Sequence, residues 1–129
     1  MTKEEAIYNI LTESELSKYV GDRIYPLVVP NGVNKYPFVI YTQEVTRTVG
    51  TKDGDRRTLN LALSVVSKGY KEAHEIACAL QTVFFSDHTT EIEKAVGWDD
   101  FRFESESEMF DLASDTYMVK TEVSYEYSF

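Results

Sequence analysis

The feature that most constrains this fold is a change in the spacing of apolar residues along the chain. Leucine or valine occupies every second position from Leu59 to Val65. Past Tyr70 the apolar side chains fall instead on one face of a helix, at Ala73, Ile76, Ala77, Leu80, Val83 and Phe84. Alternation predicts a strand with one buried face, over residues 57–67, and the second spacing predicts an amphipathic helix over residues 70–85. Packing this helix on the sheet would bury both apolar faces.

Three other segments are expected to complete the sheet. Residues 38–49 form a long segment rich in aromatic and β-branched side chains, and Asp53-Gly54 after it is typical of a hairpin loop. Residues 101–109 alternate, which places phenylalanines on one face and Arg102 with three glutamates on the other. Residues 117–127 alternate between aromatic or apolar side chains and polar ones. We therefore expect a long β-hairpin arm followed, after the helix, by two closing strands.

The start of the chain predicts short helices and an edge segment. Residues 2–5 and 12–15 both have the T-x-x-E pattern of a helix capping box, and Gly21 suits the end of the second helix. Residues 22–30 are extended but contain two prolines, which fit only a sheet edge. The predicted class is α+β, with one main helix packed on an antiparallel sheet. The length of 129 residues fits a single domain over residues 1–129.

The formal net charge of −9 comes entirely from the end of the chain. Residues 87–129 contain twelve acids and three bases, whereas residues 1–86 are neutral. Such an acidic chain is a poor candidate for nonspecific binding to duplex DNA or to an anionic membrane. The sequence has no apolar run long enough to span a bilayer and its start has no apolar stretch typical of a secretory signal, so a soluble protein made in a cytoplasm is expected.

Motifs for catalysis or metal binding are not found in the sequence. Its six glycines do not form a phosphate loop or a dinucleotide fingerprint, and Asp53-Gly54-Asp55 lacks the rest of a calcium-binding loop. The single cysteine, Cys78, excludes an internal disulfide and is expected to be an inert thiol near the buried face of the helix. We therefore predict a protein that is not an enzyme and that uses no cofactor and no metal.

Two groups of residues are candidates for contacts between subunits. The hairpin arm is basic, and the last strand ends in aromatic side chains that face either the core or a partner. The interface candidates are Arg47, Lys52, Arg56, Arg57, Tyr125, Tyr127 and Phe129. A basic arm and acidic closing strands on one chain suit a head-to-tail contact between copies, which closes into a ring when the rotation permits.

Two stretches carry a resemblance to a known family. Gly21-Asp22-Arg23-Ile24-Tyr25-Pro26, followed by Pro30 and then Tyr36-Pro37-Phe38-Val39-Ile40-Tyr41, resembles the core of the small tail-completion proteins of tailed phages and prophages. The resemblance implies a structural, non-enzymatic subunit that caps the head-proximal end of the tail tube as a ring, hexameric in this family, and joins it to the head connector. The implied partners are other copies, the head-connector and tail-tube proteins, and no membrane. The implied location is the virion, with the host cytoplasm during assembly.

The acidic closing strands then allow two hypotheses. Their glutamates are Glu104, Glu106, Glu108, Glu122 and Glu126. If they line the lumen of a ring, they would repel DNA phosphates, so that DNA passes through without specific binding. Alternatively, the chain is a DNA mimic that inhibits a nucleic-acid-binding partner, because glutamates at every second position of a strand are about 6.6–6.8 Å apart, near the spacing of phosphates.

Overall fold

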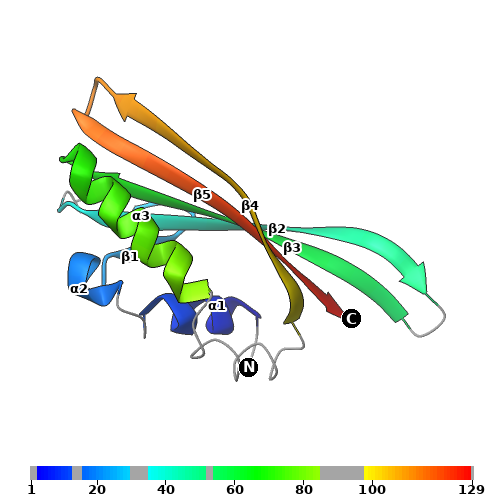
Figure 1. The fold of residues 1–129 in the computed structure, drawn as a ribbon. Coiled ribbons are helices and arrows are strands. Elements are labelled where there is room, and N and C mark those ends of the chain that lie inside the picture. The colour runs from blue at the N-terminus through cyan, green and yellow to red at the C-terminus, as the bar shows by residue number, and fades with distance from the viewer. Residues whose placement is uncertain (1–2, 13–15, 30–34, 52–53, 85–97, 129) are drawn as a thin grey trace.

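The computed structural model describes residues 3–12, 16–29, 35–51, 54–84 and 98–128. They form three helices and five strands: α1 (Lys3–Thr12), α2 (Ser17–Val20), β1 (Ile24–Pro26), β2 (Phe38–Thr51), β3 (Gly54–Ser67), α3 (Tyr70–Phe84), β4 (Trp98–Asp111) and β5 (Thr116–Ser128). Figure 1 shows these helices gathered on one face of a long, twisted sheet. The predicted α+β class, the main helix, the two short helices and the long hairpin are all confirmed.

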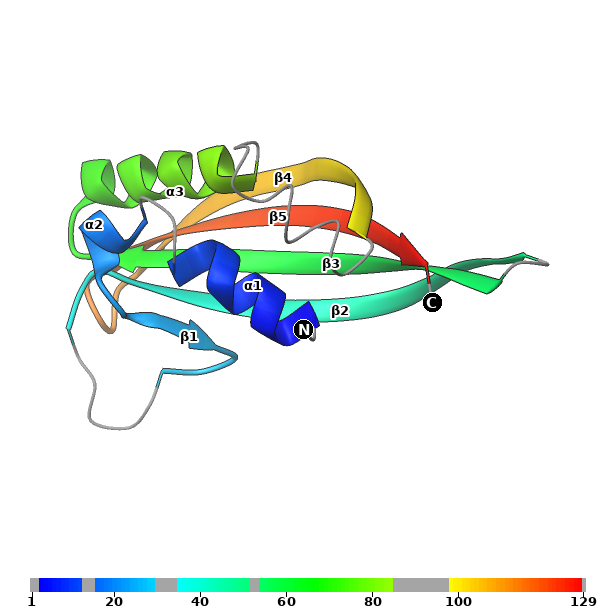
Figure 2. The same ribbon diagram turned by 90° about the horizontal axis from the view of Figure 1, so that it is seen from below.

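The five strands form one sheet in the order β1-β2-β3-β5-β4. β2, β3, β5 and β4 pair antiparallel, as expected, whereas β1 pairs parallel to β2 through Ile24 and Val39. The sheet is therefore mixed. β1 and β2 run in the same direction, so both strands begin at the same end of the sheet. β1 lies at the edge of the sheet, as expected for a strand that contains Pro26, because proline has no backbone N–H to donate to a neighbouring strand. Figure 2 shows the β2–β3 hairpin extending well beyond the helices.

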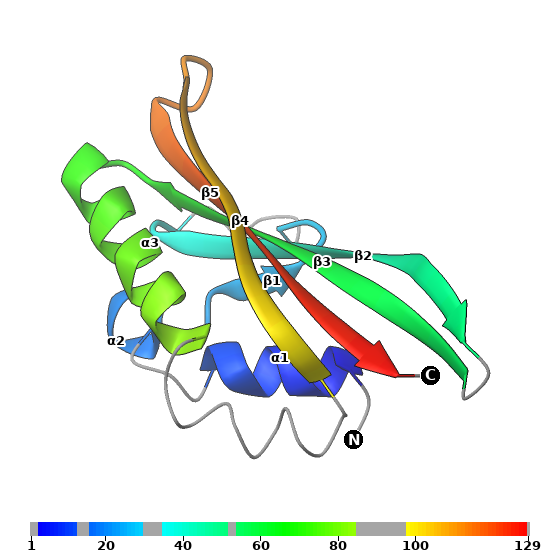
Figure 3. The ribbon, with the colours of Figure 1, turned by 45° about the vertical axis from the view of Figure 1, so that its right-hand side comes forward.

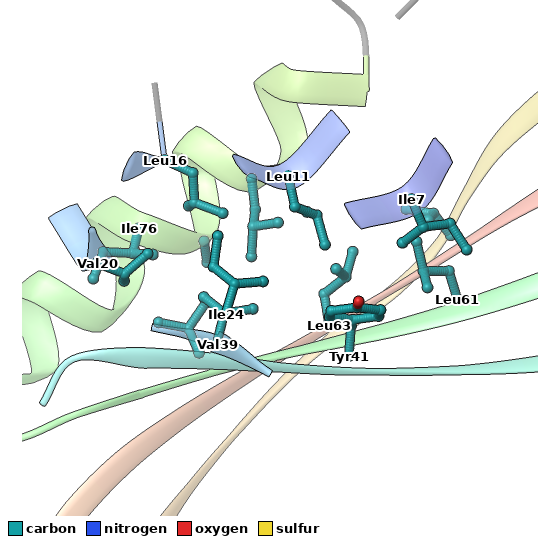
Figure 4. Packing of buried hydrophobic residues seen from close by; sticks show 14 of the residues in the cluster. Ile7, Leu11, Leu16, Val20, Ile24, Val39, Tyr41, Leu61, Leu63 and Ile76 are labelled. Atoms are coloured by element: carbon teal, nitrogen blue, oxygen red, sulfur yellow. The ribbon is translucent and has the colours of Figure 1, made fainter. Parts of the chain in front are cut away.

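The core lies between the helices and one face of the sheet. Leu59, Leu61, Leu63 and Val65 of β3 are all buried, which confirms the predicted alternation. They are covered by apolar side chains from all three helices and from Leu16, which directly precedes α2. Figure 4 labels Ile7 and Leu11 of α1, Leu16, Val20 of α2 and Ile76 of α3. Ala73 and Ala77 are fully buried and small, so α3 can approach the sheet closely.

Local hydrogen bonds define the ends of two helices. Gly21 follows α2 with a φ of +61°, and its N–H donates to the Ser17 carbonyl at 2.8 Å, which confirms the predicted glycine cap. Before α3, Ser67 Oγ accepts from the Gly69 N–H at 3.1 Å and donates to Glu72 Oε1 at 2.6 Å.

The second predicted capping box is wrong: Thr12 is the last residue of α1, where its hydroxyl donates to the Tyr8 carbonyl at 2.8 Å, and Leu16 precedes α2 without a side-chain cap. The expected capping residue at 2, residues 13–15, the hairpin tip at 52–53 and the polar segment 86–97 lie outside the described residues.

Candidate functional site

The register of β4 separates the glutamates that the sequence places on one face. Phe103 lies opposite the buried Val123, whereas Ser105 lies opposite Glu122, with a register shift between them. Glu104 is therefore an extra residue, and it reverses which face each later side chain of β4 occupies. The predicted common face for Glu104, Glu106 and Glu108 is wrong. Glu104 lies on the face without helices, and Glu106 and Glu108 lie on the face that carries α3.

The face of the sheet away from the helices is acidic and built from small polar side chains. Ser124 Oγ donates to Glu104 Oε1 at 2.7 Å, and Ser105 Oγ donates to Glu122 Oε2 at 2.8 Å. Lys120 Nζ lies 3.3 Å from Glu122 Oε1. The hydrogen bond from Ser105, followed by the bond and the charge of Lys120, lowers the pKa of Glu122 below its ordinary value. Glu122 is thus a fixed negative charge at neutral pH.

This face also carries a broad, shallow hollow of about 540 Å³. It is lined by Thr42, Gln43, Glu44, Asn60, Leu61, Ala62, Glu104, Lys120, Glu122 and Val123. Glu126 lies on the same face, because β3 and β5 pair without a register shift and Glu126 alternates with the buried Tyr125. Sequence reasoning missed Glu44, which joins the cluster only because β2 lies beside β3. Within the described ranges, no group of three or more acidic, histidine or cysteine side chains is arranged to hold a metal.

On the opposite face, glutamates connect the edge strand β4 to α3. Glu108 Oε2 accepts from Tyr70 Oη at 2.9 Å and lies 2.6 Å from His74 Nε2, while Gln81 donates to Glu106 at 3.1 Å. The hydrogen bonds from His74 and Tyr70 lower the pKa of Glu108, and the same carboxylate raises the pKa of Tyr70. These glutamates support the fold of the edge. His74 was not singled out for this role by the sequence, because its partner is 34 residues away.

A pH experiment tests this connection. The pKa of Glu108 is lower in the folded chain than its ordinary value of 4.5, so its contribution to stability is complete above that value and is lost as the pH falls through the folded-state pKa. We expect Glu108→Gln to lower the melting temperature near neutral pH, and the difference from the parent chain to shrink as the pH falls through the folded-state pKa of Glu108. Tyr70→Phe should have a smaller effect, and none once Glu108 is replaced. A melting-temperature difference that stays constant with pH would contradict this role.

The two groups of interface candidates meet along the hairpin arm. In the strand ladder Arg57 lies between Arg47 of β2 and Tyr127 of β5. The side chain of Arg57 is half-buried, whereas those of Arg47, Arg56 and Tyr127, and all of Lys52 and Phe129, lie outside what the structure describes. The arm and the end of β5 thus form one continuous region of the sheet, although their residues are about 70 positions apart in the chain.

Two predictions about single side chains are corrected by burial. Tyr125 is only 1% exposed and belongs to the core, so it anchors the last strand and does not offer a surface for a partner. Cys78 is exposed, not near the buried face, because the helix turns it away from its inward-facing neighbour Ala77. As far as the described helices go, each is too short or too polar to cross a membrane.

Comparisons with known proteins agree with this architecture. No curated protein matches the chain at a significant level. Among solved structures, a chain from the "Virion of native gene transfer agent (GTA) particle" superposes with a TM-score of 0.73 at 16% sequence identity, covering 98% of this chain and 95% of that one, which shows a shared fold. Residues 5–125 match a family of phage tail structural proteins. The chain belongs to the tail completion protein gp17 family.

Proposed function

We propose that this protein caps the head-proximal end of a phage-like tail tube and joins it to the head connector. The observation that carries the proposal is the match of residues 5–125 to the tail completion family. The similar fold in a gene transfer agent virion supports it, because that particle is described as a virion and the two chains superpose over nearly their whole lengths. The expected location is the virion, after assembly in the host cytoplasm.

In this proposal residues 1–129 act as one domain that assembles into a ring, with six copies as the family suggests. The partners are the neighbouring copies, the tail-tube protein and the head connector. The β2–β3 arm supports this role, because it extends beyond the helices and can reach a neighbour (Figure 2). The role is structural, and the proposal requires no catalytic residue, cofactor or metal.

The helix-free face of the sheet is the proposed wall of the DNA channel. Glu44, Glu104, Glu122 and Glu126 lie on it, together with two bases, Lys120 in the hollow and Arg102 opposite Ser124. Fixed carboxylates repel phosphates, so DNA would pass without binding. Glu106 and Glu108 are left out of this wall, since they contact α3. Because Glu106 and Glu108 are not on the same face as Glu104, this face lacks the row of evenly spaced glutamates on which the DNA-mimic alternative depends.

Charge reversal in the arm tests the proposed joining role. We expect Arg56→Glu combined with Arg57→Glu to reduce the fraction of tails joined to heads by about ten-fold, because like charges at an interface oppose docking. The measurement is a count of joined particles by electron microscopy after mixing heads, tails and the variant. Circular dichroism should show an unchanged fold.

A matched control compares single substitutions. Lys71→Glu, at an exposed base of α3, changes the net charge as much as Arg57→Glu alone but leaves the arm intact, and joining should stay close to that of the parent chain. Unchanged joining in the arm variant would count against the proposal, as would an equal loss in the control.

A further inference from the structure

The segment after β1 presents two large apolar side chains to solvent. Leu27 is 68% and Val28 is 70% exposed. The Leu27 N–H donates to the Tyr41 carbonyl at 3.0 Å, and the Val28 N–H donates back to the Pro26 carbonyl at 2.8 Å, which closes a tight turn around Leu27. Leu27 has a φ of +67°, a backbone conformation that costs free energy for any residue other than glycine. We call Leu27 and Val28 the apolar knob.

An apolar pocket of about 250 Å³ lies at the other edge of the sheet. It is lined by Tyr70, Glu108, Met109, Phe110, Tyr117, Met118 and Val119. Its aromatic walls pack together, with the rings of Phe110 and Tyr117 at 4.9 Å and those of Tyr70 and Tyr117 at 5.6 Å. Since an apolar cavity of about 150 Å³ holds a benzene molecule, this pocket has room for an aliphatic side chain.

The knob and the pocket cannot meet within one chain. The knob follows β1 and the pocket borders β4, and these strands are the two edges of the sheet. Three strands separate them, and neighbouring strands are about 4.8 Å apart. Figure 3 shows the β4–β5 turn projecting away from α1 and α2. Two complementary surfaces on opposite edges are what a head-to-tail contact between copies requires.

The charges around the two surfaces are also complementary. Residues 16–38, which contain the knob, hold the bases Lys18, Arg23 and Lys35 and one acid, Asp22. Residues 106–117, which contain most of the pocket, hold four acids and no base, although Lys68 from outside this segment donates to the Ser114 carbonyl. This difference favours docking of one copy's knob edge on another copy's pocket edge.

We propose that Leu27 and Val28 of one copy insert into the pocket beside Phe110 and Tyr117 of the next copy. The contact is distinct from the basic arm, and it rests on the proposed assembly of copies into a ring. It accounts for two exposed apolar surfaces that would otherwise have to be kept in water, where patches of this kind commonly mark interaction sites. The occupant of the pocket is therefore another copy of this chain.

Cysteine pairing tests the contact directly. In a Cys78→Ser background, Val28→Cys and Phe110→Cys are made as two separate proteins, mixed under mild oxidation and examined on a nonreducing gel. We expect a disulfide-linked heterodimer, because a knob in the pocket brings the two sulfur atoms within bonding reach. The matched control replaces Phe110→Cys with Lys71→Cys, an exposed site of α3 outside the pocket, and should give at most background pairing.

A second measurement uses charged side chains. Val28→Asp and Phe110→Asp should each weaken self-association by about ten-fold or more in native mass spectrometry, as expected for anchor residues of an interface. Tyr8→Asp and Phe103→Asp change exposed aromatic residues outside both surfaces and should leave self-association unchanged. A ring that forms without the specific heterodimer overturns this contact and leaves the proposed function standing. Absence of both the heterodimer and any self-association, alone or on tail tubes, overturns the contact and the ring together.

Discussion

Leu63→Ala is expected to lower the free energy of unfolding by about 3 kcal/mol, within the range of about 2–5 kcal/mol measured for buried leucines. Leu63 is fully buried in the middle of β3, between Tyr41 of β2 and Thr121 of β5, with helices above it (Figure 4). Packing on both sides limits how far the site can collapse, so the variant loses the transfer energy of the side chain and leaves a cavity. The melting temperature should fall by about 10 °C.

The control for this prediction is another leucine. Leu112, in the β4–β5 turn, is 86% exposed, and Leu112→Ala should change stability by less than about 0.5 kcal/mol. Urea unfolding of both variants and the parent chain measures the difference, with equal slopes expected because each folded state exposes a similar surface on unfolding. Equal stability of Leu63→Ala and Leu112→Ala would show that the core is not where the structure places it.

Reversing charge on the helix-free face should have the largest effect on function. Under the proposed channel, Glu104→Lys combined with Glu122→Lys places lysines along the DNA path in every copy of the ring. Each lysine that contacts a phosphate strengthens binding to DNA. It also makes the slope of the logarithm of the binding constant against the logarithm of the salt concentration steeper by about 0.9. DNA held in the channel leaves slowly, so we expect delivery of DNA by assembled particles to fall by about ten-fold or more.

The helix-bearing face supplies the matched control. Glu5→Lys combined with Glu75→Lys changes the net charge equally, but both side chains are exposed on helices that cover the other face of the sheet. Particles carrying this variant should deliver DNA close to the parent level. Counts of joined particles by electron microscopy separate a delivery defect from an assembly defect. Equal delivery by the two variants would contradict the assignment of the helix-free face to the channel.

Elements with regular spacing were predictable from the sequence. The burial of β3 from Leu59 to Val65 and the inward face of α3 follow from alternation and from helical periodicity, and both are confirmed. The alternation of β5 is confirmed for the same reason, since it pairs with β3 without a register shift. In these elements each side chain's position depends only on its own segment.

The candidate site was less predictable, because its parts come from different segments. Glu104 shifts the register of β4, and the sequence pattern around it does not show which residue the partner strand leaves unpaired. The contact of Glu108 with His74 depends on α3 lying beside the edge strand. Glu44 reaches the acidic face only through the pairing of β2 with β3. Each of these positions is decided by a neighbour in space.

The sequence by itself determined the class of fold, the buried faces of the regular elements and the acidic character of the closing strands. It did so because periodicity and charge are properties of the chain that packing preserves. Only the tertiary structure decided which acids share a face, why Tyr125 is in the core, and that the Leu27–Val28 knob and the Phe110–Tyr117 pocket lie at opposite edges of one sheet. Strand order and register set these relations, and one extra residue in a strand is enough to move every later side chain to the other face.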